Sequence, residues 1–225
     1  MTETFGIGQL RPEDPTSEYN VIQFIIQQTL LRTRTIVPVK VTSVVNAGGV
    51  VPVGFVSVQP LVNLVDGNGN STPHGTISNV PYMRLQGGTN AIILDPVVGD
   101  NGFMAIADRD ISAVKSSLQL ANPGSGRTFN LADGIYLGGI LNGTPKQYLG
   151  FTATGITLVD INGNSLTSGT SGWTFVGNVN WTGSFTATGN ITAGQGTADQ
   201  VDLQNHKHAG VTAGGAQTSV PVPGT

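Results

Sequence analysis

Cysteine is absent from the 225-residue sequence, and charged residues make up only 10% of it. Without cysteine the chain forms neither disulfides nor thiolate metal sites, and the redox compartment stays open. Aromatic residues are also scarce, at 6%, whereas glycine occurs 32 times. This composition is unlike that of an ordinary monomeric globular domain. It favours one domain followed by an extension.

The chain also lacks a basic patch and a long hydrophobic run. Its formal net charge is -3 and no Lys/Arg cluster is interleaved with aromatic residues, so nothing favours nucleic-acid binding. The most apolar run, 21–31, contains three glutamines and is shorter than the roughly 20 residues that span a bilayer. The first residues lack the basic and apolar regions of a secretory signal. We therefore expect a protein that is made and folded in the cytoplasm.

Ionised residues are rare in the last third of the chain. From position 149 onward they are Asp160, Asp199, Asp202 and Lys207. The rest of this part is rich in Gly, Thr and Asn, with Val, Ile, Phe and both tryptophans. Disordered segments usually have the opposite profile, with high net charge and few β-branched residues. We expect ordered β-structure here.

A helix is expected near the N-terminus. Asp14 or Ser17 can cap it, and it should run to about Thr33. Two roles stay open, because the helix can pack on its own domain or contact a neighbouring subunit. Its apolar residues at helical spacing are Ile22, Ile25, Ile26 and Leu30.

Alternating apolar residues then predict short strands. Val37, Val39 and Val41 share one face of the first strand. Five or so antiparallel strands suit a small closed barrel of the oligonucleotide/oligosaccharide-binding (OB) type, since closure removes exposed edges. The further strands are expected at 51–58 with an extension through 61–65, and at 80–86, 91–94 and 102–107.

The polar residues of this region predict loops. We expect His74 to be an exposed loop residue and the aspartates to be turn formers, without a paired-carboxylate geometry. A transitional segment follows the barrel, with a candidate strand at 127–131. The aspartates are Asp95, Asp100, Asp108 and Asp110.

Internal repeats mark the segment after position 150. The sequence Phe-Thr-Ala-Thr-Gly occurs at 151–155 and again at 185–189. A finer period of six residues separates Gly177, Gly183 and Gly189, with alternating apolar residues between them. Such a pattern describes β-structure winding around an axis. One chain has too few repeats to bury the apolar face, so we predict three intertwined chains.

Two histidines, His206 and His208, stand together near the C-terminus. In an extended strand both imidazoles share one face, while Lys207 points to the other. Two imidazoles alone make a poor metal site. Three copies on a threefold axis would supply six imidazole nitrogens, an octahedral cage for a first-row transition metal. The alternative is a pair of exposed polar residues in a loop.

The predicted fold is therefore mainly β. A small OB-type barrel with one preceding helix leads into an intertwined trimeric β-helix or β-prism rod, which ends in a metal-bound tip. The parts are an N-terminal segment with the helix at 1–34, the barrel at 35–115, a connector at 116–149, the rod at 150–204 and the metal-binding apex at 205–225.

This order of parts resembles the central spike, or cell-puncturing protein, of contractile-tailed bacteriophages and related injection machines, along nearly the whole chain. The likeness includes Pro-Val-Val-Gly-Asp at 96–100 before the last barrel strand, and His206-Lys-His208-Ala-Gly after the rod. The resemblance implies one iron ion held by His206 and His208 of three chains. Calcium at Asp199 or Asp202 is the alternative ion.

The resemblance also implies partners and a location. It implies a non-enzymatic homotrimer at the distal tip of a phage tail baseplate, assembled in the host cytoplasm and carried in the virion. Tail tube or baseplate hub proteins would hold the barrel, and the bacterial outer membrane or cell envelope would be the target. Neither nucleic acid nor a small-molecule substrate is implied.

Three rival functions share some of these features. A trimeric tail fibre or adhesin has the same rod but a broad receptor-binding head, whereas only seventeen residues follow His208. A hexapeptide-repeat acyltransferase needs many more coils than the repeats supply. A His-x-His metallohydrolase needs further ligands, and His74 is the only other histidine.

Overall fold

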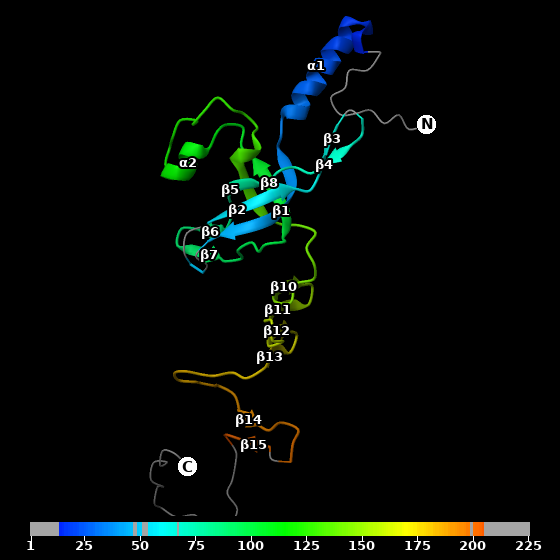
Figure 1. Cartoon of the computed structure of the whole chain (residues 1–225). Coiled ribbons are helices and arrows are strands. Elements are labelled where there is room, and N and C mark those ends of the chain that lie inside the picture. Colours follow the sequence, from blue (N-terminus) through cyan, green and yellow to red (C-terminus); the bar gives the residue numbers. More distant parts are fainter. Residues whose placement is uncertain (1–13, 47–48, 51–53, 67, 199, 205–225) are drawn as a thin grey trace, which may run out of the picture. The chain divides into compact units, whose positions relative to one another are not determined.

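A computed structural model describes residues 14–46, 49–50, 54–66, 68–198 and 200–204 of the chain. The chain divides into two compact units, of which the first ends at Thr144 and the second begins at Pro145. The described residues are mainly β-structure with one main helix, as the sequence predicted (Figure 1). No helix among them is long and apolar enough to cross a membrane.

The main helix, α1, spans Glu18–Arg32 and follows a single 3-10 turn, η1, at Asp14–Thr16. Ser17 is its N-cap, because the Ser17 hydroxyl accepts a hydrogen bond from the backbone N–H of Asn20 at 3.2 Å. The predicted helix is confirmed, and Ser17 rather than Asp14 caps it. No residue of α1 is buried.

Five strands of the first unit form one sheet in the order β5-β2-β1-β8-β9, with every neighbouring pair antiparallel. The central strand β1 carries the predicted alternation, since Val39 and Val41 are buried while Lys40 is exposed. The strands are β1 (Ile36–Val45), β2 (Phe55–Pro60), β5 (Ile77–Pro81), β8 (Asn101–Ile106) and β9 (Gly134–Gly139).

This sheet curls until its two outer strands meet. Tyr82, next to β5, forms a parallel bridge with Tyr136 of β9, and the backbone N–H of Met83 donates to the Tyr136 carbonyl at 2.7 Å. Register shifts in three of the strand pairs increase the bend. The half-barrel that results encloses a core of Val39, Val41, Val56, Val58, Val80, Tyr82, Met104 and Tyr136.

The fifth strand of the sheet, β9, comes from 116–149, which the sequence predicted to be a connector. Glycine obscured it, because three of its six residues are glycine. Glycine is required at position 134, where a Cβ would collide with the side chain of Met104. The strand predicted at 127–131 is wrong, since these residues form a loop that runs into a 3-10 turn, η2, at Leu131–Asp133.

The described part of the first unit also contains two short hairpins and one short helix. The strand predicted at 80–86 is divided, because the chain leaves the sheet after β5 and then begins a hairpin. Residues 61–65, predicted to extend β2, contribute instead to the other hairpin. These elements are β3 (Leu64–Val65) with β4 (Ser71–Thr72), β6 (Leu85–Gly87) with β7 (Asn90–Ile92), and α2 (Ser112–Ser117).

The second unit contains a four-stranded antiparallel meander and a two-stranded hairpin. In the meander each strand pairs with the next one in the chain. An irregular segment joins β13 to β14 (Figure 1). A trimeric rod involves several chains and stays a prediction. The strands are β10 (Tyr148–Thr152), β11 (Gly155–Val159), β12 (Ser165–Gly169), β13 (Gly172–Val176), β14 (Thr192–Ala193) and β15 (Val201–Asp202).

A repeated turn closes one hairpin in each unit. Asp160 Oδ1 accepts a hydrogen bond from the backbone N–H of Asn164 at 2.9 Å, and Gly163 takes a left-handed φ of 88°. Asp66 Oδ1 accepts the equivalent bond from Asn70 at 2.8 Å. An aspartate that binds its own following backbone is typical of such turns. Local sequence therefore accounts for both.

We expect Met104→Ala to destabilise the half-barrel by about 2–5 kcal/mol, because it leaves a cavity in the core. Met104 is 0% exposed, whereas Met83 in the same unit is 54% exposed. Met83→Ala is therefore the matched control. Amide hydrogen exchange in β1 and β8 measures the effect. Equal exchange rates in the two variants would contradict the assignment of Met104 to the core.

Candidate functional site

The predicted metal ligands have no described geometry. His206, His208 and Asp199 lie outside the described residues. Among the residues that the structure does describe, no group of three or more His, Cys, Asp or Glu side chains comes together. The metal-bound tip therefore stays a prediction.

Two other predicted residues, Asp202 and His74, can be located. Asp202 lies in β15, and its Oδ1 accepts a hydrogen bond from the Thr192 hydroxyl at 2.6 Å. His74 lies in a loop, as expected, but is half-buried rather than exposed. Its backbone carbonyl accepts a hydrogen bond from Gln59 Nε2 at 2.8 Å. Neither residue belongs to a group of three or more candidate metal ligands among the described residues.

One face of the β10–β13 sheet is apolar across all four strands. The register places Leu158 between Leu149 and Leu166, and it pairs Leu166 with Phe175. Residues two positions away along each strand share this face. Seven of its eight side chains are thus apolar. The members of this apolar sheet face are Leu149, Phe151, Ile156, Leu158, Leu166, Ser168, Trp173 and Phe175.

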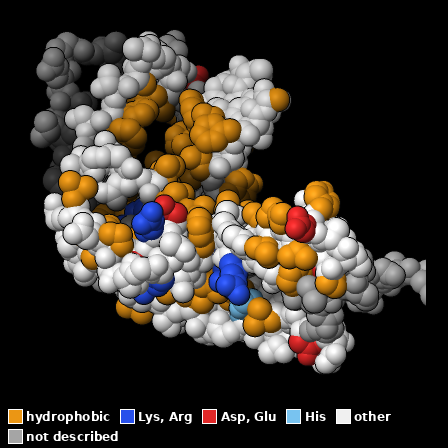
Figure 2. All heavy atoms as spheres, turned by 90° about the horizontal axis from the view of Figure 1, so that it is seen from above, with side chains coloured by type: hydrophobic (Ala, Val, Ile, Leu, Met, Phe, Trp, Pro, Cys, Tyr) orange, Lys and Arg blue, Asp and Glu red, His pale blue; other side chains and the backbone are white. Residues whose placement is uncertain are grey.

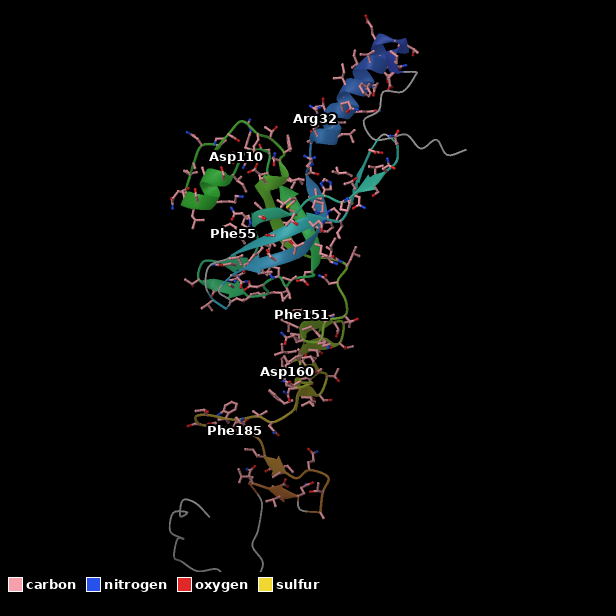
Figure 3. All side chains as sticks on the ribbon, viewed as in Figure 1. Arg32, Phe55, Asp110, Phe151, Asp160 and Phe185 are labelled. Carbon is pink, nitrogen blue, oxygen red and sulfur yellow. The ribbon has the colours of Figure 1, made fainter. Side chains whose placement is uncertain are left out.

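Nothing in the described part of the chain covers the apolar sheet face. Five of its large side chains are between 50% and 72% exposed, with Phe151 the most exposed (labelled in Figure 3). The opposite face is mainly Thr, Ser and Gly, as the residues next to these in sequence show. Monomeric soluble proteins rarely expose a continuous apolar patch of this kind. The arrangement is that of an interaction surface.

The irregular segment after β13 also exposes apolar side chains. It carries the six-residue repeats, yet only Thr192–Ala193 of the segment 177–193 forms a strand. Trp181 and Phe185 contact each other edge-to-face, with ring centroids 5.4 Å apart, and both remain exposed. The first Phe-Thr-Ala-Thr-Gly copy is paired in β10 and β11, whereas the second copy lies outside any strand. Of the two identical five-residue sequences, only the one at 151–155 is paired with a neighbouring strand.

Hydrophobic exposure extends to the first unit. Hydrophobic side chains are spread over much of the surface seen in Figure 2, whereas charged side chains are few. Two short chain segments contribute strongly, namely α1 and the β6–β7 hairpin, where Leu85 and Ile92 face each other across the strands and are both exposed.

A buried ion network in the first unit was not predicted. Arg127 Nε donates to Asp133 at 2.6 Å, and Arg127 NH2 donates to Asp110 at 2.8 Å. Both aspartates are buried, and Asp110 is labelled in Figure 3. Asp110 does form a turn, as expected, because it accepts from the Ser112 backbone N–H at 2.8 Å. The ion pair of Asp110 with Arg127 has no signal in the sequence, since no periodic pattern links residues seventeen positions apart.

The pKa values of both carboxyl groups are lowered by this network. Hydrogen bonds from Ser112 and Ser125, with the charge of Arg127, lower the pKa of Asp110 to about 2. The hydrogen bond from Arg127 lowers the pKa of Asp133. Both groups are therefore ionised at neutral pH and saturated with donors. The network ties together the segment that connects β8 to β9.

Of the other aspartates predicted to form turns, Asp100 does so and Asp95 forms an ion pair. Asp100 Oδ2 accepts from the backbone N–H of Val97 at 2.8 Å, which confirms a turn. Asp95 instead pairs with Arg84, whose NH2 lies 2.7 Å from Asp95 Oδ1, and both side chains are largely buried. A pairing across eleven positions again has no local sequence signal.

Comparison with known proteins adds no relative, because no protein-family model and no curated protein matches the chain.

Arg127→Met should lower the unfolding temperature of the first unit at pH 7, because two buried carboxylates lose their cation. The pKa values of these carboxyls are depressed in the folded state, so their contribution is present above about pH 4 and is lost as the pH falls toward 2. The difference from the parent protein should therefore shrink between about pH 5 and pH 2. Thermal unfolding followed by circular dichroism measures it.

Arg109→Met is the control for this prediction. It removes the same charge from an exposed position. A loss of stability at pH 7 as large as that of Arg127→Met would show that net charge matters and the network does not.

Proposed function

We propose that the protein is a homotrimeric spike that pierces a bacterial cell envelope from the tip of a contractile phage tail. The observation that carries this proposal is the uncovered apolar sheet face of β10–β13. The role is mechanical rather than enzymatic.

Three copies around a threefold axis account for the apolar sheet face. An antiparallel sheet with one apolar face must cover that face. In a cyclic trimer each copy presents the same face, and three such faces turned inward form a triangular β-prism with a dry interior. The outward Thr, Ser and Gly residues then meet water. Such a trimer resists fraying, because one chain can separate only by exposing the core of all three.

The order of strands in the first unit supports the OB-type barrel of a spike. The order β5-β2-β1-β8-β9, with the parallel bridge between Tyr82 and Tyr136, is that of a five-stranded, partly open barrel. A small barrel followed by β-rich, Gly/Thr-rich sequence and then His206 and His208 is the arrangement that resembles central spikes. We place the barrel against tail tube or baseplate hub proteins, and the virion's distal tip at the other end of the chain.

The donor set at the tip fits a structural metal. His206 and His208 from three chains supply six neutral imidazoles, which leave no open coordination position. Imidazole suits iron, nickel, copper and zinc, and octahedral geometry counts against zinc. We propose iron, one ion per trimer. Calcium at Asp199 or Asp202 is the weaker alternative, since the described Asp202 carboxylate is already bound by Thr192.

Phe175→Asn should convert the trimer to monomer or raise the concentration at which it forms, because it places an amide in the apolar interior. Thr174→Asn is the matched control, since Thr174 is the neighbouring residue of β13 and faces the other way. Molar mass in solution, measured by light scattering across a dilution series, tests both. A parent protein that is monomeric would refute the proposal, and so would equal effects of the two substitutions.

The parent protein should contain one iron per three chains, and His206→Ala/His208→Ala should lose it while the trimer persists. Metal mass spectrometry together with molar mass measures both quantities. Below about pH 6 the metal should be released, because histidine with an ordinary pKa of ~6.5 becomes protonated. A trimer without stoichiometric metal would instead favour a tail fibre or adhesin.

A further inference from the structure

The helix α1 exposes a continuous apolar stripe. Its residues recur at spacings of three, four and four positions, which places them on one side of the helix. Their side chains are between 46% and 69% exposed. We call this set the α1 stripe, and it consists of Tyr19, Ile22, Ile26 and Leu30.

The rest of the first unit contacts α1 on a side of the helix other than the α1 stripe. Phe24, Ile25 and Arg32 line a groove against Phe129, a residue that follows the Arg127 ion network. At about 100° per residue these three point away from the centre of the α1 stripe. Contacts within the described residues therefore leave the stripe exposed.

Phe129 itself is held in an unfavourable backbone conformation. Its φ is 48°, in the left-handed region that aromatic residues rarely adopt. Its backbone N–H donates to the Asp108 carbonyl at 3.4 Å. Phe129 thus lines the groove beside α1, and this groove marks the side of the helix that faces the rest of the first unit.

Charge indicates what covers the α1 stripe. Between Glu18 and Arg32 the helix has no ionised side chain. Charges that complement a foreign partner are the usual source of specificity at a docking surface, and α1 has none between its first and last residues. An uncharged apolar stripe of this spacing can instead pack against identical stripes around a threefold axis.

We infer that the α1 stripe packs against the same stripe of two further copies, as a parallel three-helix bundle. This inference rests on the proposed homotrimer, which tethers three α1 helices to one particle and so raises their effective concentration. A helix of fifteen residues is only marginally stable in water by itself, and the bundle supplies its missing contacts.

The absence of cysteine allows a direct test in the full-length protein. Ile26→Cys places a single thiol on the α1 stripe, and Gln27→Cys places one on the next residue, which lies outside the stripe. Diamide oxidises two thiols to a disulfide only when their Cα atoms come within about 7 Å. We expect Ile26→Cys to yield a covalent dimer on a non-reducing gel, because the third thiol of a trimer has no partner left. Gln27→Cys should remain a single chain.

Ile22→Cys is a second stripe variant, in case Ile26→Cys impairs folding, and Gln27→Cys serves as the control for both. The molar mass of each reduced variant is measured in parallel. A trimer in which neither stripe cysteine cross-links overturns the bundle and leaves the spike proposal standing. Cross-linking as strong from Gln27→Cys as from Ile26→Cys also overturns it, since no defined stripe then exists. A monomeric mass refutes the spike proposal and the bundle together.

Discussion

The uncovered apolar sheet face is the constraint on which the second unit depends. Large aliphatic and aromatic side chains cover one face of the meander, and the described part of the chain offers nothing to bury them. Burial of apolar surface is the main favourable term in folding, so a sheet of this kind is stable only with a partner. The low charge and the Thr-rich opposite face suit a narrow assembly in which each copy completes the core of the others.

The first unit solves the same physical problem within one chain. Its outer strands meet at Tyr82 and Tyr136, so the sheet closes over eight buried side chains. All the buried hydrophobic residues described lie between Val39 and Tyr136, within this unit. This contrast is the basis for proposing that the first unit docks and that the second unit assembles with further copies. The α1 stripe is an exception within the first unit, because its apolar side chains are exposed.

Sequence patterns recovered those elements whose signals are local. The helix at Glu18–Arg32 and the strand at Ile36–Val45 have clear periods of 3.6 and 2, and both are present. The glycine-rich strand β9 has no such signal, because glycine occupies three of its positions, one of them, Gly134, against Met104. The predicted apolar face lay in the six-residue repeats at 177–193, whereas the apolar sheet face described lies in the preceding four-stranded meander. Three of the candidate metal ligands, His206, His208 and Asp199, lie outside the described residues, so the metal site stays a prediction.

By itself the sequence determined the mainly β character, the capped N-terminal helix and the aspartate-led turns, because composition, periodicity and turn chemistry act over a few residues. Only the tertiary structure decided that β9 completes the half-barrel, that Arg127 joins Asp110 and Asp133, and that seven apolar side chains of four strands share one face. Each of these depends on strand register or on loops that bring distant residues together, and hydrogen-bonded register cannot be read from any single segment.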